Sequence, residues 1–161
     1  MRPLFAAPCL LGLSVLALVA CTEGGDPASP PSAPPAAAVL AGVDLNRPVR
    51  ALGTEPFWSV ELTGTEMVYT EPDPPEQRAP QPVAAVHGTT VTYESETADG
   101  TPLSVTLVAT ECSDGMSDRT YPLTAMVRLG ARSLNGCAAS VAAIMSAGES
   151  GLVVEQDQPA G

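Results

Sequence analysis

The residues of this 161-residue chain that could do chemistry are four cysteines, a single histidine and an excess of carboxylates. His87 precedes Gly88 in a predicted turn, which indicates an exposed imidazole and not a catalytic base. The sequence contains no glycine-rich phosphate loop, serine nucleophile elbow, EF-hand spacing or metal-binding helix motif. Paired carboxylates drawn from Glu55, Asp114 and Asp118 are the catalytic alternative, because spacing along a chain does not fix distance across a barrel. We predict a protein that is not an enzyme and that holds no metal or cofactor.

The first chemical feature along the chain is Cys21, which ends an apolar segment that begins at Leu4, after Arg2. A positive start followed by an uncharged apolar segment is typical of a signal peptide. Leu18-Val19-Ala20 before the cysteine resembles the bacterial lipobox, which implies cleavage before Cys21 and transfer of a diacylglycerol to its sulfur. The alternatives are a transmembrane helix and ordinary export with a free thiol.

The lipobox resemblance also predicts where the protein resides. Two or more acyl chains on Cys21 would hold the protein firmly on a membrane. Thr22 stands where an aspartate is associated with retention in the inner membrane. We therefore expect a lipid anchor in the outer membrane, with the protein facing the periplasm.

The remaining cysteines are expected to pair. Cys9 leaves with the leader and Cys21 carries lipid, so Cys112 and Cys137 remain in the exported part of the chain. An oxidising envelope favours a disulfide between them. Such a loop closure stabilises a fold by about 3 to 4 kcal/mol in the chain-entropy model. A pairing also leaves neither thiol as a nucleophile and too few ligands for a zinc site.

The charge of the chain limits its partners. Removal of the leader takes away Arg2 and none of the 18 acidic residues, so the formal charge becomes one unit more negative than the −11 of the whole chain. This sign disfavours nucleic acid and anionic lipid headgroups as partners. The acidic residues either keep the protein soluble or select a cationic partner.

The chain divides by composition into four parts. Residues 1–20 form the leader, and 21–48 comprise the lipidated cysteine and a tether. Thr22–Ala38 consists mainly of Pro, Ala, Ser and Gly, which bury too little apolar surface to fold. Residues 49–155 are the predicted β domain, and 156–161 a disordered tail.

The predicted domain carries the patterns of short strands joined by turns. Strands are expected at 58–62, 67–69, 83–86, 89–94, 103–108 and 123–129. The Asp99-Gly100 turn precedes one of them, whereas the proline-rich segment 71–82 is expected to be a loop. Residues 138–147 fit a helix or a strand equally well. We predict an all-β fold, a small antiparallel barrel or sandwich with one disulfide, preceded by a disordered tether.

Two aromatic residues open the first predicted hairpin. Phe57 and Trp58 are adjacent on a strand, so they point to opposite faces and at most one enters the core. We expect Trp58 to fill the core and Phe57 to close the barrel end, with a ligand-facing aromatic as the alternative. Glu55 is expected to cap this turn or to pair with Arg119.

A second polar segment follows Cys112. Asp114-Gly115 favours a tight turn, and Arg119 offers a planar fork for a carboxylate. Loop architecture beside a disulfide accounts for this segment, and an acidic surface formed with Glu111 is the alternative. The candidate binding residues are Glu55, Phe57, Trp58, Asp114, Asp118, Arg119 and Tyr121.

Three motifs together resemble an uncharacterised family of bacterial envelope lipoproteins. They are GTEPFW at 53–58, C-x-D-x-MSDR-x-YP at 112–122 and GCA at 136–138. The resemblance covers about residues 51–138 and implies a small β-rich envelope domain, similar in setting to the META-type and C-type lysozyme-inhibitor lipoproteins. It implies no established activity, and the proline-rich insert at 71–82 departs from the pattern.

The functional prediction combines the predicted location, the charge and the fold of the chain. We expect a lipid-anchored envelope protein with a small β-barrel binding or protective domain. The most specific version of this prediction is a lysozyme inhibitor, because an acidic surface complements a basic enzyme. The alternative is a structural or assembly lipoprotein that supports envelope integrity under stress and has no small ligand.

Overall fold

The structure is a computed structural model that describes residues 38–73 and 76–155. The predicted leader, the lipidation of Cys21, most of the predicted tether and the tail at 156–161 lie outside the described residues. Within the described part of the chain, no helix has the length and apolar character needed to cross a membrane.

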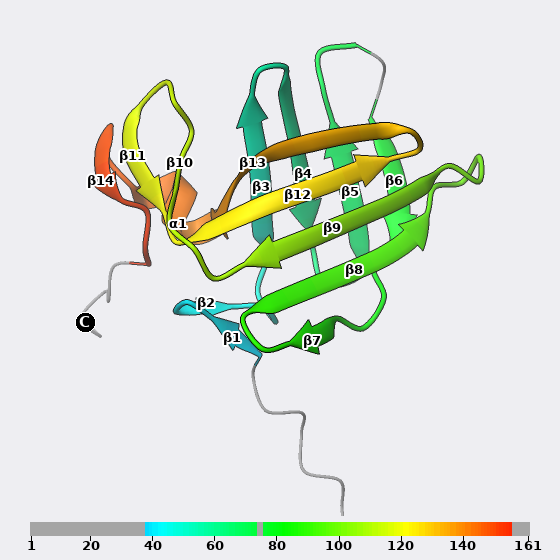
Figure 1. Cartoon of the computed structure of the whole chain (residues 1–161), viewed down its shortest axis with the longest axis horizontal. Helices are drawn as coiled ribbons and strands as arrows, with labels where there is room; N and C mark the ends of the chain where they lie inside the picture. Colours follow the sequence, from blue (N-terminus) through cyan, green and yellow to red (C-terminus); the bar gives the residue numbers. More distant parts are fainter. Residues whose placement is uncertain (1–37, 74–75, 156–161) are drawn as a thin grey trace, which may run out of the picture. The chain divides into compact units, whose positions relative to one another are not determined.

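Most of the described residues lie in strands, and nine strands join into one antiparallel sheet (Figure 1). In chain order they are β3 (Val49–Thr54), β4 (Phe57–Leu62), β5 (Glu66–Thr70), β6 (Gln77–Pro80), β7 (Ala85–His87), β8 (Thr90–Glu96), β9 (Pro102–Val108), β12 (Leu123–Leu129) and β13 (Arg132–Ser140). Across the sheet the order is β6-β5-β4-β3-β13-β12-β9-β8-β7. The predicted all-β antiparallel fold is confirmed.

The sheet curls at β13. Residues Arg132–Ala138 of β13 pair with β12, whereas Cys137–Ser140 pair with β3. In Figure 1, strands β12, β9 and β8 run across β3, β4, β5 and β6. The sheet is therefore a half-barrel whose two parts face each other across the core, as in orthogonal packing.

Alternating side chains supply that core. Leu103, Val105 and Leu107 of β9 are buried, as predicted, while the residues between them are partly exposed. The β8–β9 turn forms at Asp99-Gly100, where the Gly100 N–H donates to the Thr97 carbonyl at 2.8 Å. Gly100 has a φ of 81°, a conformation that favours glycine. The turn dipeptide was thus a correct signal for this hairpin.

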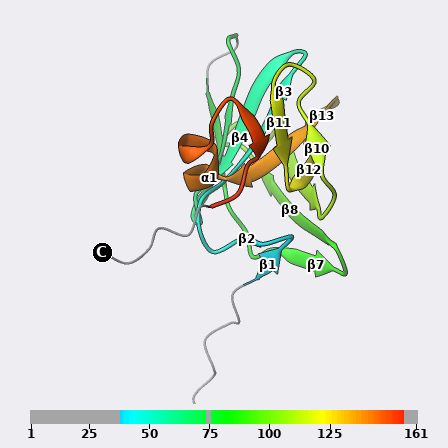
Figure 2. The same ribbon diagram turned by 90° about the vertical axis from the view of Figure 1, so that its left-hand side faces the viewer.

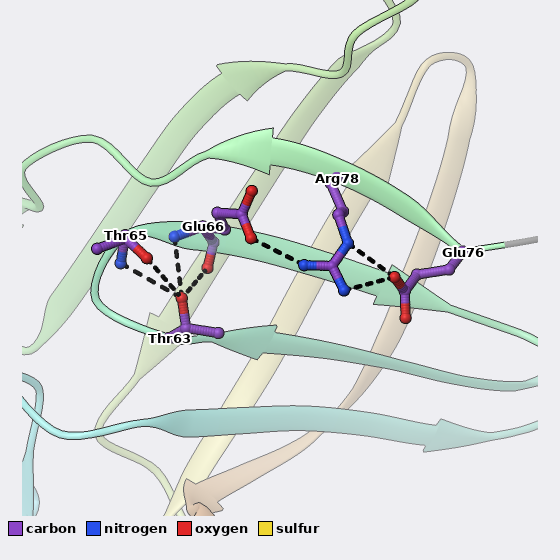
Figure 3. A network of polar contacts seen from close by, with 5 residues as sticks. All are labelled: Thr63, Thr65, Glu66, Glu76 and Arg78. Atoms are coloured by element: carbon purple, nitrogen blue, oxygen red, sulfur yellow. Dashed lines mark hydrogen bonds and ion pairs between the residues drawn. The ribbon is translucent and has the colours of Figure 1, made fainter.

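The proline-rich segment differs from its prediction, because it contains strand β6 where we expected a loop. Pro80 is tolerated there because β6 lies at the edge of the sheet. Arg78 ties this edge to β5, since its guanidinium lies 2.8 Å from Glu66 and 2.7 Å from Glu76 (Figure 3). In the neighbouring β4–β5 turn, the Thr63 hydroxyl accepts a hydrogen bond from the Glu66 N–H at 2.9 Å.

Packed structure also begins before the predicted boundary at Val49. Strands β1 (Val39–Leu40) and β2 (Val43–Asp44) form a separate two-stranded sheet. This hairpin and the residue after it place three side chains in the core, those of Leu40, Val43 and Leu45. The predicted tether therefore overlaps the folded domain by several residues.

A second layer lies beside the far end of β13 (Figure 2). It contains a three-stranded sheet of β10 (Cys112–Ser113), β11 (Asp118–Tyr121) and β14 (Ser150–Leu152), together with helix α1 (Val141–Ser146). Strand β14 pairs with β11 in parallel. This layer encloses a small cluster of buried residues, namely Tyr121, Cys137, Ala139, Ala143 and Val153.

Segment 138–147, which fitted a helix or a strand equally well, contains both. It continues β13 as far as Ser140 and then forms α1. The Ser140 side chain caps the helix by accepting a hydrogen bond from the Ala143 N–H at 3.1 Å.

Candidate functional site

The predicted disulfide is present and joins the two layers. Cys112 and Cys137 are bonded, with their Cα atoms 5.4 Å apart. Cys137 is fully buried on β13, while Cys112 lies at the start of the β10–β11 hairpin and is partly exposed. The bond therefore fixes the base of that hairpin on the main sheet.

Trp58 fills the core, as predicted, and two glycines make room for it. Its side chain is 4% exposed. A Cβ atom at Gly53 would lie 2.2 Å from the indole nitrogen, and one at Gly136 would lie 3.0 Å from the ring and 1.9 Å from the Leu52 carbonyl oxygen. Gly53 of the first motif and Gly136 of the third therefore leave the space that Trp58 needs in the core. Trp58 is not accessible to a partner.

Phe57 takes the opposite face and remains 55% exposed. We expected it to close the barrel end, and its exposure shows that it is not packed into the core. Its exposure agrees with the solvent-facing part of the alternative, and a ligand for it stays a prediction. Phe57 ends the β3–β4 turn, which also contains Glu55 and Pro56.

Asp114 organises the β10–β11 turn. Its carboxylate accepts hydrogen bonds from the N–H groups of Met116 at 3.0 Å and Ser117 at 2.8 Å, and from the Ser117 hydroxyl at 2.8 Å. Burial opposes ionisation of this carboxyl, yet these donors lower its pKa below the usual value. The Asp114 carbonyl also accepts from the Thr54 hydroxyl at 2.9 Å. Two of the three motifs are therefore tied together directly.

The other candidates from this segment have structural partners. Tyr121 is buried, and its hydroxyl donates to Asp114 at 3.3 Å. The predicted pair between Glu55 and Arg119 is wrong, because Arg119 instead donates to the carbonyls of Gly148 at 2.8 Å and Ala147 at 3.5 Å, just after α1. Asp118 is exposed and forms no ion pair among the described residues.

Glu71, just after β5, is the best-protected carboxylate among the ion pairs of the described residues, with 5% of its side chain exposed. Arg132 donates two hydrogen bonds to the Glu71 carboxylate, at 2.7 and 2.8 Å, and the Tyr69 hydroxyl donates a third at 2.8 Å. The bonds from Arg132 lower the pKa of Glu71, while burial and Glu71 together raise the pKa of Tyr69 to about 12. The network fixes the β5 end against the β12–β13 hairpin.

This network should make stability depend on pH. The pKa of Glu71 is lower in the folded chain than its usual value of 4.5, so its contribution is complete above that value and disappears as the pH falls through the folded pKa. Glu71→Gln should lower the free energy of unfolding by about 1 kcal/mol at pH 7, since Arg132 is partly exposed. Urea denaturation of both chains at pH 7 and at acidic pH should show this difference shrinking.

Glu94 on β8 is the control for that experiment because it is exposed and forms no ion pair among the described residues. Glu94→Gln should change stability by less than about 0.5 kcal/mol. A Glu71→Gln difference that persisted unchanged into acid would show that the carboxylate charge does not stabilise the network.

Three loops converge at one end of the half-barrel and enclose an open depression of about 660 Å³, which we call the loop groove. They are the β3–β4 turn, the start of the β5–β6 connection and the β10–β11 turn. The residues that line it are Thr54, Glu55, Pro56, Phe57, Glu71, Pro72, Asp73 and Met116. Loops on a rigid β scaffold are where binding residues usually gather.

The lining of the loop groove combines apolar side chains with negative charge. Phe57 and Met116 both line it, and they are 55% and 65% exposed. Its lining contains three carboxylates and no cationic residue, and of the three only Glu71 has an ion-pair partner in the described part of the chain, Arg132. Glu55 and Asp73 form no ion pair among the described residues. The groove thus combines an apolar contact surface with uncompensated negative charge.

Of the predicted binding residues, the structure brings Glu55 and Phe57 to the loop groove, and Asp114 lines an adjoining depression of about 470 Å³. Met116, Pro72 and Asp73 were missed. Met116 carried a usable signal, since an apolar residue between Asp114-Gly115 and Ser117 lies at the tip of a turn and is left exposed. Residues 38–73 and 76–155 contain no group of three His, Cys, Asp or Glu placed to hold a metal ion.

Comparisons with protein-family models, with curated proteins and with solved structures give no match to this chain. The resemblance to envelope lipoproteins therefore stays a prediction, which depends on the three motifs alone.

Proposed function

We propose that this chain is a lipid-anchored protein of the bacterial cell envelope whose β domain binds a cationic partner. The observation that carries the binding role is the loop groove, in which exposed Phe57 and Met116 lie beside Glu55 and Asp73 with no cationic residue in the lining. An acidic surface of this kind attracts and orients a basic protein.

The disulfide supports an extracytoplasmic setting for the domain. Structural disulfides persist in oxidising compartments and are rare in the cytosol. The bond between Cys112 and Cys137 joins two packed layers, one partner being fully buried. Export followed by lipidation of Cys21 brings the domain to such a compartment.

The lining of the loop groove favours binding over catalysis. Its residues include no histidine, serine or cysteine. Asp114 of the adjoining depression holds the N–H groups of its own turn and has a structural task. The alternative is a hydrolase that uses a pair of carboxylates. If it were correct, single substitutions of Glu55, Asp114 and Asp118 would reduce the rate of a hydrolysis reaction.

The anchor has a direct test in the native host. Cells grown with an alkyne fatty acid should label the wild-type chain, because the glyceryl group on the Cys21 sulfur and the freed Cys21 amine both carry acyl groups. Cys21→Ala should abolish the label, because the variant has no sulfur to receive the diacylglycerol. An unlabelled wild-type chain would remove the anchor from the proposal.

The binding role can be tested with lysozyme, a basic enzyme and the most specific partner that we predict. Full chain purified from membranes in mild detergent, added at micromolar concentration and low ionic strength, should slow lysozyme turnover. The effect should weaken as salt screens the charges. If lysozyme is unaffected and crosslinking of the anchored protein in cells recovers envelope-assembly proteins without any basic partner, the structural role is the better description.

A further inference from the structure

The loop groove is built before any partner arrives. Each of its three loops is held by a contact that does not use the exposed apolar side chains. Thr54 donates to the Asp114 carbonyl at 2.9 Å, which joins two of the loops. Arg132 holds Glu71 of the third with bonds of 2.7 and 2.8 Å. A site that is already ordered loses little conformational entropy on binding.

The fold does not need the exposed apolar groups. Trp58 satisfies the core on one face of β4, and Phe57 points the other way by strand alternation. Met116 lies at the tip of the β10–β11 turn, whose backbone is fixed by the Asp114 carboxylate. Water is therefore in contact with an aromatic ring and a thioether that belong to one groove, which is typical of an interaction site.

Charge decides what kind of chain would occupy the groove. Glu55 and Asp73 provide negative charge in the same lining as Phe57 and Met116. A second copy of this chain carries a formal charge of −11 and no lysine, so it would be repelled. Its arginines are also engaged in part, since Arg47, Arg50, Arg78 and Arg132 pair with its own carboxylates. The occupant must come from a different, basic protein.

We propose, resting on the function proposed above, that the loop groove binds a segment of a basic protein that carries an apolar side chain next to arginine or lysine. The apolar side chain packs between Phe57 and Met116, and the cationic side chain lies beside Glu55 or Asp73. Arginine suits this position well, because its guanidinium can bond a carboxylate in two places and stack on an aromatic ring. The groove would thus select a short sequence pattern as well as a positive surface.

Capped pentapeptides are the probes for this selectivity. Gly-Arg-Phe-Arg-Gly should shift the NMR signals of the Met116 methyl group and the Phe57 ring in the full chain, in a saturable way. A peptide with serine in place of phenylalanine loses the apolar contact, and one with glutamate in place of arginine loses the charge contact. Both should bind at least about fivefold more weakly.

Matched substitutions locate the binding surface. Phe57→Ser should weaken binding of the arginine peptide by about tenfold, and Glu55→Gln by about threefold. The controls are Met126→Ser, which removes an apolar side chain that is 44% exposed on β12, and Glu94→Gln on β8. Neither control should change binding, and urea denaturation checks that all four variants stay folded.

The outcomes separate the site from the general function. If the chain binds basic proteins but Phe57→Ser and Glu55→Gln bind as well as the wild type, the groove assignment is overturned and the proposed function survives. If neither the peptide nor any basic protein binds at low salt, both are overturned. Self-association of the wild-type chain that Phe57→Ser abolishes would make a second copy the occupant, and would overturn the proposal of a basic segment.

Discussion

Gly136→Ala is expected to lower the free energy of unfolding by about 3 kcal/mol, although it adds a single methyl group. The new Cβ atom would lie 1.9 Å from the Leu52 carbonyl oxygen and 3.0 Å from the Trp58 ring. The first neighbour is backbone, so the clash cannot be relieved by a side-chain rotation. Strands β3 and β13 would have to move apart where the sheet curls, or the fold would open locally.

Urea denaturation, followed by tryptophan fluorescence, measures this loss, and Trp58 is the single tryptophan of the chain. Gly148→Ala is the matched control, because a Cβ atom there meets no atom within 4 Å. It should change stability by less than about 0.5 kcal/mol. A loss below about 1 kcal/mol in Gly136→Ala would show that β3 and β13 adapt easily, and would weaken the structural explanation of that glycine.

The same geometry explains what two of the motifs do. Gly53 and Gly136 come from different motifs and both lie against Trp58. Thr54 of the first motif donates a hydrogen bond to Asp114 of the second motif, which also accepts one from Tyr121. Most motif residues therefore hold the scaffold together. Glu55, Phe57 and Met116 are among the exposed motif residues, and all three line the loop groove.

Local patterns predicted the local parts of this fold well. The hairpins around 57–70 and 90–108 follow from alternation and from turn residues, both of which act over a few positions. The β1–β2 hairpin was missed because two-residue strands are too short to show a period. Ala41 and Gly42 both have positive φ in its turn, and Gly42 is the one residue there whose type indicates such a conformation. Strand β6 was missed because the prolines of segment 71–82 suggest a loop, and an edge position tolerates Pro80.

Long-range parts could not be predicted in the same way. Glu71 and Arg132 are 61 residues apart in the chain, and nothing in either neighbourhood indicates the other. In the loop groove, pairing of β4 with β5 brings Phe57 near Pro72, but Met116 comes from the β10–β11 turn, and no local pattern places it beside them. The disulfide is the exception, because counting the cysteines that remain after export left one pair.

That disulfide carries the second large expected effect. Replacing both Cys112 and Cys137 by alanine should lower the free energy of unfolding by about 3 to 4 kcal/mol, because the bond closes a separation of 25 residues in the unfolded chain. Alanine is the better replacement at Cys137, since a serine hydroxyl would be buried there. Urea denaturation under oxidising conditions measures the loss.

Reductant supplies the control, because it acts on the bond and not on the sequence. The wild-type chain should lose nearly as much stability in dithiothreitol as the double variant loses by substitution, and the double variant should not respond. The bond also fixes the base of the hairpin that carries Met116, so its loss should loosen the loop groove and weaken peptide binding beyond the loss of global stability. If reduced wild-type chain remained as stable as oxidised chain, packing around Tyr121 alone would hold the second layer. The fold would then give no reason to prefer an oxidising compartment.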